Sequence, residues 1–170
     1  MTHEQAKLAE GLLKALQAER DGHSFYTMAS QTSQDPKAKE VFAQLAAEEL
    51  DHMQFLTRHY ESVQKTGMPD AAARLGERAR LPEAWPIFSE GIRARLKDAH
   101  FEMSALSIGI QLELDAQKFY RAQAEATDDQ AAKQFLMELA DWESGHYQTL
   151  LRQQEQLKED YWSESGFSAF

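Results

Sequence analysis

An internal repeat constrains the fold of this 170-residue chain more than any other feature. A shift of 94 residues places LAAEELDHMQFL, residues 45–56, on LADWESGHYQTL, residues 139–150. The same shift places Glu19 and Tyr26 on Glu113 and Tyr120. Such self-similarity indicates one supersecondary unit used twice. We therefore expect the two halves of the chain to fold on the same plan.

The local patterns in each half are those of helices. Polar and apolar residues alternate with a helical period through four stretches, at about residues 3–32, 36–65, 90–126 and 130–158. Asp35-Pro36 supplies a cap and a first-turn proline for the second stretch, and Asp128-Asp129 can cap the fourth. We predict an all-α four-helix bundle made of two repeated helical hairpins.

The four stretches divide one domain, residues 1–170, into four parts. We expect a hairpin at 3–65, a crossover at 66–94, a second hairpin at 95–158 and an aromatic C-terminal tail at 159–170. Residues 65–97 contain seven Lys and Arg against four Asp and Glu, although the chain has a net charge of −10. We expect these basic residues to complement the acidic bundle, with anion binding as the alternative. The tail is expected to pack over the bundle end or a sister subunit.

Composition excludes several classes of function. A net charge of −10 argues against nucleic acid and anionic membranes as partners. The absence of cysteine excludes disulfides, thiolate metal sites and cysteine nucleophiles. The first residues lack the basic head and apolar middle of a signal peptide. We expect a cytoplasmic protein.

Both halves place acidic and imidazole side chains on lines that should face the core. Each has a Glu on its first helix and a Glu-x-x-His motif that begins 30 residues later. Glu and His three residues apart share one helical face. Two hairpins folded face to face would bring together six such residues: Glu19, Glu49, His52, Glu113, Glu143 and His146.

A buried carboxylate is costly unless it is paired or binds a metal. Four carboxylates together repel one another and raise their own pKa values. Two divalent cations would balance the four negative charges. A set of carboxylates with two imidazoles suits iron or manganese, with zinc as an alternative. The six residues therefore predict a dinuclear metal site.

The motifs LQAERDGHSFY with LAAEELDHMQFL, and IQLELDAQKFY with LADWESGHYQTL, resemble those of a known family. They are similar to the rubrerythrin-like branch of the ferritin-like diiron-carboxylate superfamily, over roughly residues 3–65 and 95–158. The resemblance implies a ferritin-like bundle that holds two iron ions. It implies that Glu49 and Glu143 are bridging carboxylates and that Glu19 and Glu113 are terminal carboxylates. It also implies that His52 and His146 supply one imidazole to each metal, and that Tyr26 and Tyr120 hydrogen-bond ligand carboxylates.

The chain departs from the family pattern at two points. Rubrerythrin proper carries a cysteine-rich rubredoxin-like domain that delivers electrons, and this chain has no cysteine. We therefore expect an external electron donor. Some relatives also place an extra carboxylate one turn beyond the Glu of the third helix, where this chain has Ala116 and Gln117.

Three functions fit these observations. The first is a diiron redox protein that reacts with peroxide or dioxygen, in oxidative stress or iron homeostasis, as a homo-oligomer and most simply a dimer. The second is an iron-binding ferroxidase that stores or sequesters iron. The third is a helical bundle with a structural, non-redox metal site.

Other polar residues near the motifs have simpler interpretations. His23 lies one turn after Glu19, and we expect it to support the site or lie at the bundle surface. The alternatives are an extra or exchanging metal ligand, or a proton relay. The repeat counterpart of His59 is Gln153, so we interpret His59 as a non-ligand. Asp21 and Asp115 repeat, and an interface or solvent role is expected for both.

Overall fold

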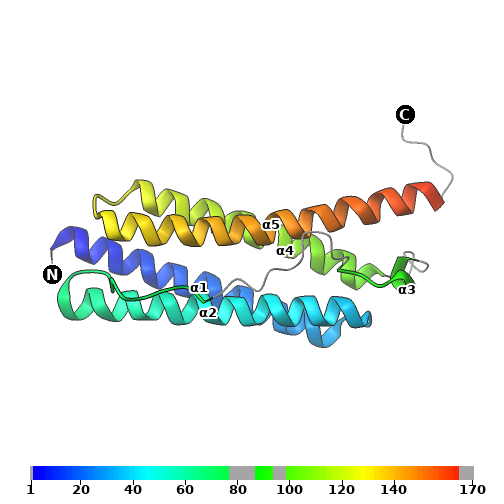
Figure 1. Ribbon diagram of the computed structural model, residues 1–170, viewed down its shortest axis with the longest axis horizontal. Helices are drawn as coiled ribbons and strands as arrows, with labels where there is room; N and C mark the ends of the chain where they lie inside the picture. Colours follow the sequence, from blue (N-terminus) through cyan, green and yellow to red (C-terminus); the bar gives the residue numbers. More distant parts are fainter. Residues whose placement is uncertain (1, 77–86, 94–98, 165–170) are drawn as a thin grey trace.

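The computed structural model of the chain describes residues 2–76, 87–93 and 99–164. Four long helices run along one axis (Figure 1). They are α1 (His3–Thr32), α2 (Pro36–Thr66), α4 (His100–Glu125) and α5 (Gln130–Glu164), and a short α3 (Glu90–Arg93) precedes α4. The prediction of an all-α four-helix bundle is confirmed.

The start predicted for the third long helix lies too early in the chain. It was expected from about residue 90, but α4 begins at His100 and Glu90–Arg93 forms a separate short helix. The N-cap residue of α4, Ala99, has a non-helical ψ of 33° and makes no side-chain capping bond. The residue at the N-cap position therefore has no side chain that marks this start. The last helix extends beyond the expected end at about 158, to Glu164.

The other helix boundaries follow from capping chemistry. Thr2 and Gln5 form a reciprocal capping box at the start of α1. The Asp35 side chain accepts a hydrogen bond of 2.9 Å from the Ala38 amide, and Asp129 accepts one of 2.8 Å from the Ala132 amide. The helix α2 ends at Thr66, and the next residue, Gly67, has a φ of 78°, a left-handed conformation that glycine adopts without strain.

Helices α1 and α2 form one hairpin, α4 and α5 form the other, and α1 lies against α4. Two buried apolar clusters fill the interior. One contains Tyr26, Phe42 and Leu106, and the other contains Leu12, Leu56, Tyr120 and Leu139. On every long helix the residues of the predicted metal site lie between these two clusters along the chain. Burial of each large apolar side chain contributes about 1.5–3 kcal/mol, so the clusters support the polar layer from both ends.

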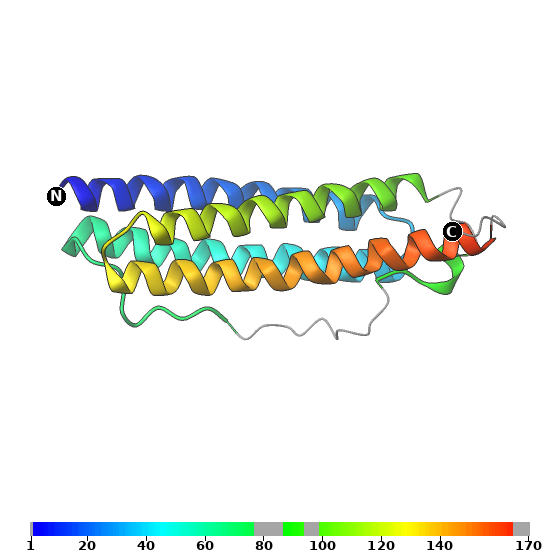
Figure 2. The ribbon, with the colours of Figure 1, turned by 90° about the horizontal axis from the view of Figure 1, so that it is seen from above.

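The crossover begins on the α2 and α5 side of the bundle. Residues 68–76 pass along that side, away from α1 and α4 (Figure 2). Where the described chain resumes, the Ile87 amide donates to Gln153 Oε1 at 2.8 Å, and the Ser89 amide donates to Asp35 Oδ2 at 3.2 Å. The middle of the expected crossover (77–86), residues 94–98 and the last part of the aromatic tail (165–170) lie outside the described residues.

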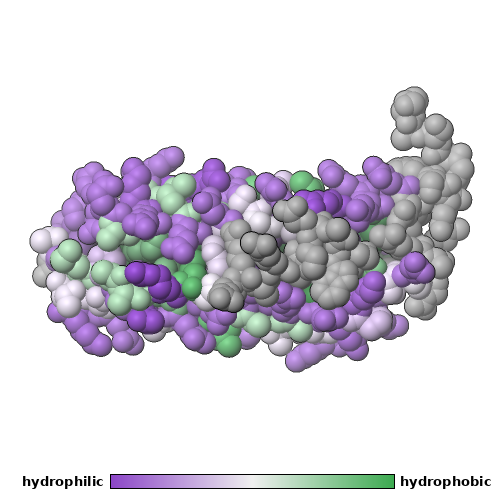
Figure 3. All heavy atoms as spheres, viewed as in Figure 1, coloured by the Kyte–Doolittle hydropathy of each residue, from purple (hydrophilic) through white to green (hydrophobic). Residues whose placement is uncertain are grey.

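Polar side chains cover most of the described surface on the face shown in Figure 3. Apolar groups show there in smaller patches. This pattern agrees with amphipathic helices that turn one side to a shared core. None of the described helices is long and apolar enough to cross a membrane.

Candidate metal centre

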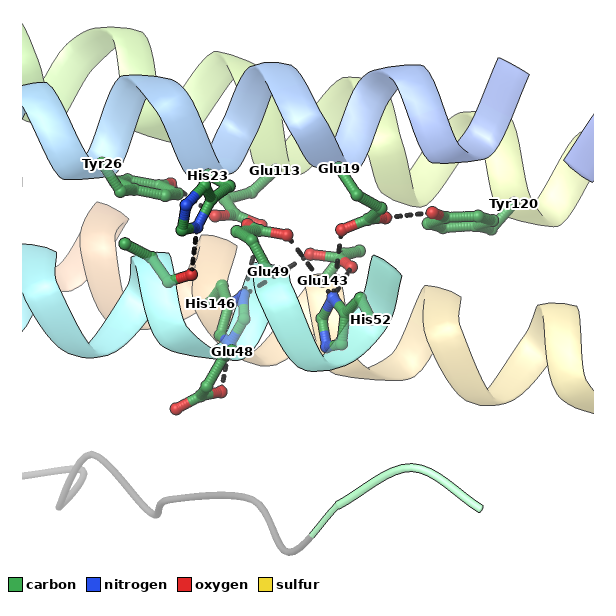
Figure 4. Close-up of polar contacts among 11 residues, drawn as sticks. Glu19, His23, Tyr26, Glu48, Glu49, His52, Glu113, Tyr120, Glu143 and His146 are labelled. Atoms are coloured by element: carbon green, nitrogen blue, oxygen red, sulfur yellow. Dashed lines mark hydrogen bonds and ion pairs between the residues drawn. The ribbon is translucent and has the colours of Figure 1, made fainter. Parts of the chain in front are cut away.

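The structure brings all six predicted residues together at mid-length of the bundle (Figure 4). They form two groups that share Glu49 and Glu143, and within each group one ligand atom per residue lies within 4.8 Å of the others. One group adds Glu19 and His52, and the other adds Glu113 and His146. Each group thus has three carboxylates and one imidazole.

Every long helix contributes to this layer. Glu19 comes from α1 and Glu113 from α4, whereas α2 and α5 each supply a Glu and a His three residues apart. None of the six is more than 5% exposed. Since Glu and His at this spacing share a helical face, the two motifs place four of the six groups on inward faces.

In both imidazoles the Nδ1 atom faces the carboxylates. Nδ1 of His52 lies 3.0 Å from Glu143 Oε1 and 3.2 Å from Glu19 Oε2. Nδ1 of His146 lies 3.4 Å from an oxygen of Glu113 and 3.4 Å from an oxygen of Glu143. Both imidazoles therefore direct the same ring nitrogen to the shared acidic centre.

The donor set fits a pair of metal ions. Among the described residues, both oxygens of Glu143 and Nδ1 of His146 are buried without a hydrogen bond, although each lies near the other site residues. Buried polar atoms normally have a hydrogen-bond partner. Oxygen and imidazole donors grouped in this way suit a divalent transition metal. The site thus has the chemistry and the unmatched donor atoms that two cations would satisfy.

The pKa values of the buried carboxylates are shifted in different directions. Burial, together with the nearby Glu19 and Glu143, raises the pKa of Glu49 well above its usual value. Burial also raises the pKa of Glu113 to about 8, with Glu143 adding to the rise and His146 opposing it. Burial acts upward on Glu143 too, but His52 and His146 outweigh it, so its pKa lies well below the usual value.

Burial acts on the pKa values of the two imidazoles in the opposite direction, because the charged form of an imidazole is the protonated one. Burial alone would lower the pKa of His52, but Glu143 and Glu19 more than compensate, and the pKa rises well above its usual value. His146 behaves in the same way, with Glu113 as the main opposing group. At neutral pH the protein groups alone therefore retain protons where cations would otherwise bind.

Two tyrosines hold the outer carboxylates. The Tyr26 hydroxyl donates to Glu113 Oε1, and the Tyr120 hydroxyl donates to Glu19 Oε1. Both tyrosines are fully buried. Burial raises the pKa of each phenol well above 10, and the neighbouring carboxylates add to the rise. Each therefore stays a hydrogen-bond donor at neutral pH.

Two residues that contact the imidazoles were missed by the sequence reasoning. Nε2 of His146 lies 2.7 Å from Glu48 Oε2. The ring of His52 instead meets Trp142 edge-on, with ring centres 5.2 Å apart. Glu48 and Trp142 occupy equivalent positions of the repeat, so their unlike identities hid them from a comparison of matching residues.

His23 is not a member of either metal group. Its Nδ1 donates to the Ala46 carbonyl oxygen at 2.7 Å, which ties α1 to the backbone of α2. This contact agrees with the expectation that His23 supports the site or lies at the bundle surface. His59 is likewise outside both groups and packs between Phe55 and Phe135.

A cavity of about 290 Å³ reaches the carboxylates from the α1 and α4 side. Its lining includes all four ligand carboxylates, but neither site imidazole. The other walls come from both halves of the repeat: Ala18, Asp21, Gly22, Leu112, Asp115, Ala116 and Phe119. The carboxylate side of the centre is therefore the accessible side, and the imidazoles lie opposite.

The aspartates of this cavity are exposed and arranged symmetrically. Gln17 Nε2 donates to Asp21 Oδ1, and Gln111 Nε2 donates to Asp115 Oδ1, both at 2.8 Å. The solvent role expected for Asp21 and Asp115 agrees with their exposure.

Comparison with known proteins agrees with the geometry. The family model for rubrerythrin matches residues 10–152, a region that contains all six clustered residues. Searches of curated proteins and of solved structures gave no match. The family is one of ferritin-like bundles with a diiron-type metal site, and the buried cluster lies where such a site is built. The chain belongs to the rubrerythrin family.

Proposed function

We propose that this protein is a diiron redox protein that reduces peroxide, or dioxygen, with electrons from an external donor. The observation that carries the proposal is the division of the site into two sides. The four carboxylates face a cavity, whereas the two imidazoles lie away from it. A small oxidant can thus approach the centre without displacing an imidazole.

Two iron ions held there would supply the two electrons that convert hydrogen peroxide and two protons into two water molecules. Glu49 and Glu143 belong to both groups, so we propose that each would help to hold both ions. Glu19 and Glu113 would each hold one ion, and the hydroxyls of Tyr120 and Tyr26 keep them in place. The external donor would then return the two electrons.

The cavity walls also restrict the substrate. Apart from carboxylates, the lining consists of small or apolar side chains, among them Ala18, Leu112 and Phe119. A volume of about 290 Å³ lies just below the range for small-molecule sites, about 300–1,000 Å³. These features favour peroxide or dioxygen over a larger organic substrate.

The iron-handling alternative has its own supporting observation. The exposed carboxylates of Asp21 and Asp115 line the same cavity, and negative charge along an entry route attracts cations. If iron is the cargo, ions should leave the site after oxidation and accumulate in a large assembly. For the redox protein we propose instead a small homo-oligomer, in the first instance a cytoplasmic dimer.

The test begins with metal-free protein loaded anaerobically with Fe(II). We expect two irons per chain, and a near-ultraviolet ferric absorption band that forms faster with hydrogen peroxide than with air. Glu49→Ala and Glu143→Ala should abolish both results, whereas Glu138→Ala, at an exposed position on α5, should leave them unchanged. Sedimentation of the same samples gives the assembly size. A chain that binds no iron, or one redox-silent ion, would refute the proposal, and many irons in a shell would favour storage.

A further inference from the structure

The two halves of the centre have the same set of groups that could bind a metal. They differ in one contact outside that set. Each group offers three carboxylates and one imidazole, and each outer carboxylate accepts a hydrogen bond from a tyrosine. The difference lies behind the imidazoles. Nε2 of His146 bonds to Glu48, but Nε2 of His52 has no hydrogen-bond partner among the described residues.

From this difference we infer that the two metal positions are unequal, and that the position beside His146 binds its ion more tightly and fills first. The inference rests on the proposed dinuclear site and concerns only the order in which its two positions fill. It assigns Glu48 as a positioning residue for His146. It also assigns Trp142 as the residue that leaves His52 without an equivalent support.

The chemistry of imidazole ligands explains why the position beside His146 should be the tighter one. For Nδ1 to offer its lone pair to a cation, the ring proton must reside on Nε2. In His146 that N–H can donate to Glu48 Oε2 at 2.7 Å, which fixes the tautomer and the ring orientation. In His52 the same N–H would be buried without an acceptor, and the ring packs against Trp142 in a T-shaped arrangement. A buried unsatisfied donor opposes that tautomer.

A carboxylate behind a ligating imidazole also makes the imidazole a stronger donor. Glu48 is itself buried, with 5% of its surface exposed, so solvent screens its charge only weakly. Removal of such an outer partner typically costs 10–100-fold in metal affinity. We expect a difference of that order between the two positions, with the tighter position beside His146.

The repeat places this asymmetry in the sequence itself. Glu48 precedes the Glu of the first Glu-x-x-His motif, and Trp142 precedes the Glu of the second. Each contacts the imidazole of the opposite hairpin, so the first hairpin supports the histidine of the second but receives no equivalent support in return.

Mn(II) is a suitable probe, because electron paramagnetic resonance distinguishes an isolated bound ion from a coupled pair. In the wild-type protein the first equivalent should give isolated bound Mn(II), and the coupled-pair signal should grow only with the second. Calorimetric titration of the same protein gives the two affinities. Repulsion between two cations would also separate the steps, so variants must show which position fills first.

Four variants make that assignment. His146→Ala should remove the tight step, and His52→Ala should retain it. Glu48→Leu should weaken the tight step by about 10–100-fold, whereas Glu48→Gln, which keeps a neutral acceptor, should lose less. In the His52→Ala background Glu48→Leu should weaken the remaining step, and in the His146→Ala background it should have no effect. Circular dichroism of the metal-free variants checks that each one folds.

The outcomes separate this inference from the proposed function. If the wild-type protein binds no metal, both fail. If it binds two ions, but Glu48→Leu leaves the tight step unchanged or His52→Ala abolishes it, this inference alone fails. A single ion that is lost in His146→Ala and kept in His52→Ala would support the inequality and contradict the dinuclear site.

Discussion

Tyr26 of the first hairpin donates a hydrogen bond to Glu113 of the second, and this contact is one of a reciprocal pair. Its counterpart runs from Tyr120 of the second hairpin to Glu19 of the first. The two bonds connect α1 and α4 on either side of the metal residues. They join the hairpins through the carboxylates themselves, so the outer ligands are positioned by the packing of one hairpin on the other.

Loss of either hydroxyl should therefore weaken both the fold and the site. In Tyr26→Phe and Tyr120→Phe a buried carboxylate loses its donor, which costs about 1–3 kcal/mol in the free energy of unfolding. Metal affinity should fall in both variants. Chemical denaturation and Mn(II) titration measure the two effects. Tyr60→Phe, at a half-buried position away from the site, is the control. Equal stability and affinity in all four proteins would show that the bonds contribute nothing.

The sequence predicted the fold and the residues of the cluster because two periodicities agree. Helical spacing places Glu49 and His52 on one face, and the 94-residue repeat places Glu143 and His146 on the equivalent face.

The outer contacts could not be found in this way. Glu48 and Trp142 occupy one repeat position with unlike side chains, and only the packing of α2 against α5 shows that both reach an imidazole. The start of α4 was missed for a similar reason, since Ala99 carries no capping side chain.

Metal binding should release protons near neutral pH. The pKa of Glu113 is about 8, and the pKa values of Glu49, His52 and His146 are also raised, so these groups hold protons that a cation must displace. Affinity should therefore fall as the pH is lowered below about 8. Calorimetry at pH 7 in buffers of different ionisation enthalpy counts the released protons. Binding without release, or with uptake, would contradict this arrangement of charges.

Gly22 allows Glu49 to lie close to α1. A Cβ at this position would come within 3.3 Å of both Cδ and Oε1 of Glu49. Gly22→Ala should therefore displace the carboxylate and lower metal affinity by roughly 10-fold, the scale expected when support for a ligand is lost. The stability of the metal-free helix should not fall in parallel, since alanine favours helix by up to about 1 kcal/mol.

The repeat provides the matched control for this substitution. Ala116 is the residue equivalent to Gly22. Ala116→Gly should lower the free energy of unfolding by up to about 1 kcal/mol and leave metal affinity unchanged. If Gly22→Ala binds metal as tightly as the wild-type protein, the close approach is not required.

Asp35 and Asp129 form a second matched pair. Each caps a helix, but Asp35 also accepts hydrogen bonds from the amide and hydroxyl of Ser89 at the end of the crossover. Asp129→Ala should cost about 1 kcal/mol through the lost cap. Asp35→Ala should cost about 1 kcal/mol more, because the contacts with Ser89 are lost as well. Urea denaturation gives both values. Equal losses would mean that these contacts do not stabilise the crossover.

His59 should make the protein sensitive to acid. Its ring stacks on Phe135 with centres 4.0 Å apart, and neither ring nitrogen has a hydrogen-bond partner among the described residues. Burial lowers its pKa to about 4, against 6.5 in an unfolded chain. Between these values the unfolded state binds more protons than the folded state, so stability rises with pH and is lost as the pH falls through this window.

Substitution by an aromatic residue without a titrating group should remove this sensitivity. His59→Phe keeps a ring between Phe55 and Phe135, so its advantage over the wild-type protein should grow as the pH falls from about 6.5 to about 4. Denaturation curves across this range, with a chelator present, measure the difference. The exposed His100, changed to Gln, is the control and should follow the wild-type curve. If the curves of His59→Phe and the wild-type protein stay parallel, the buried imidazole is not the source of the acid sensitivity.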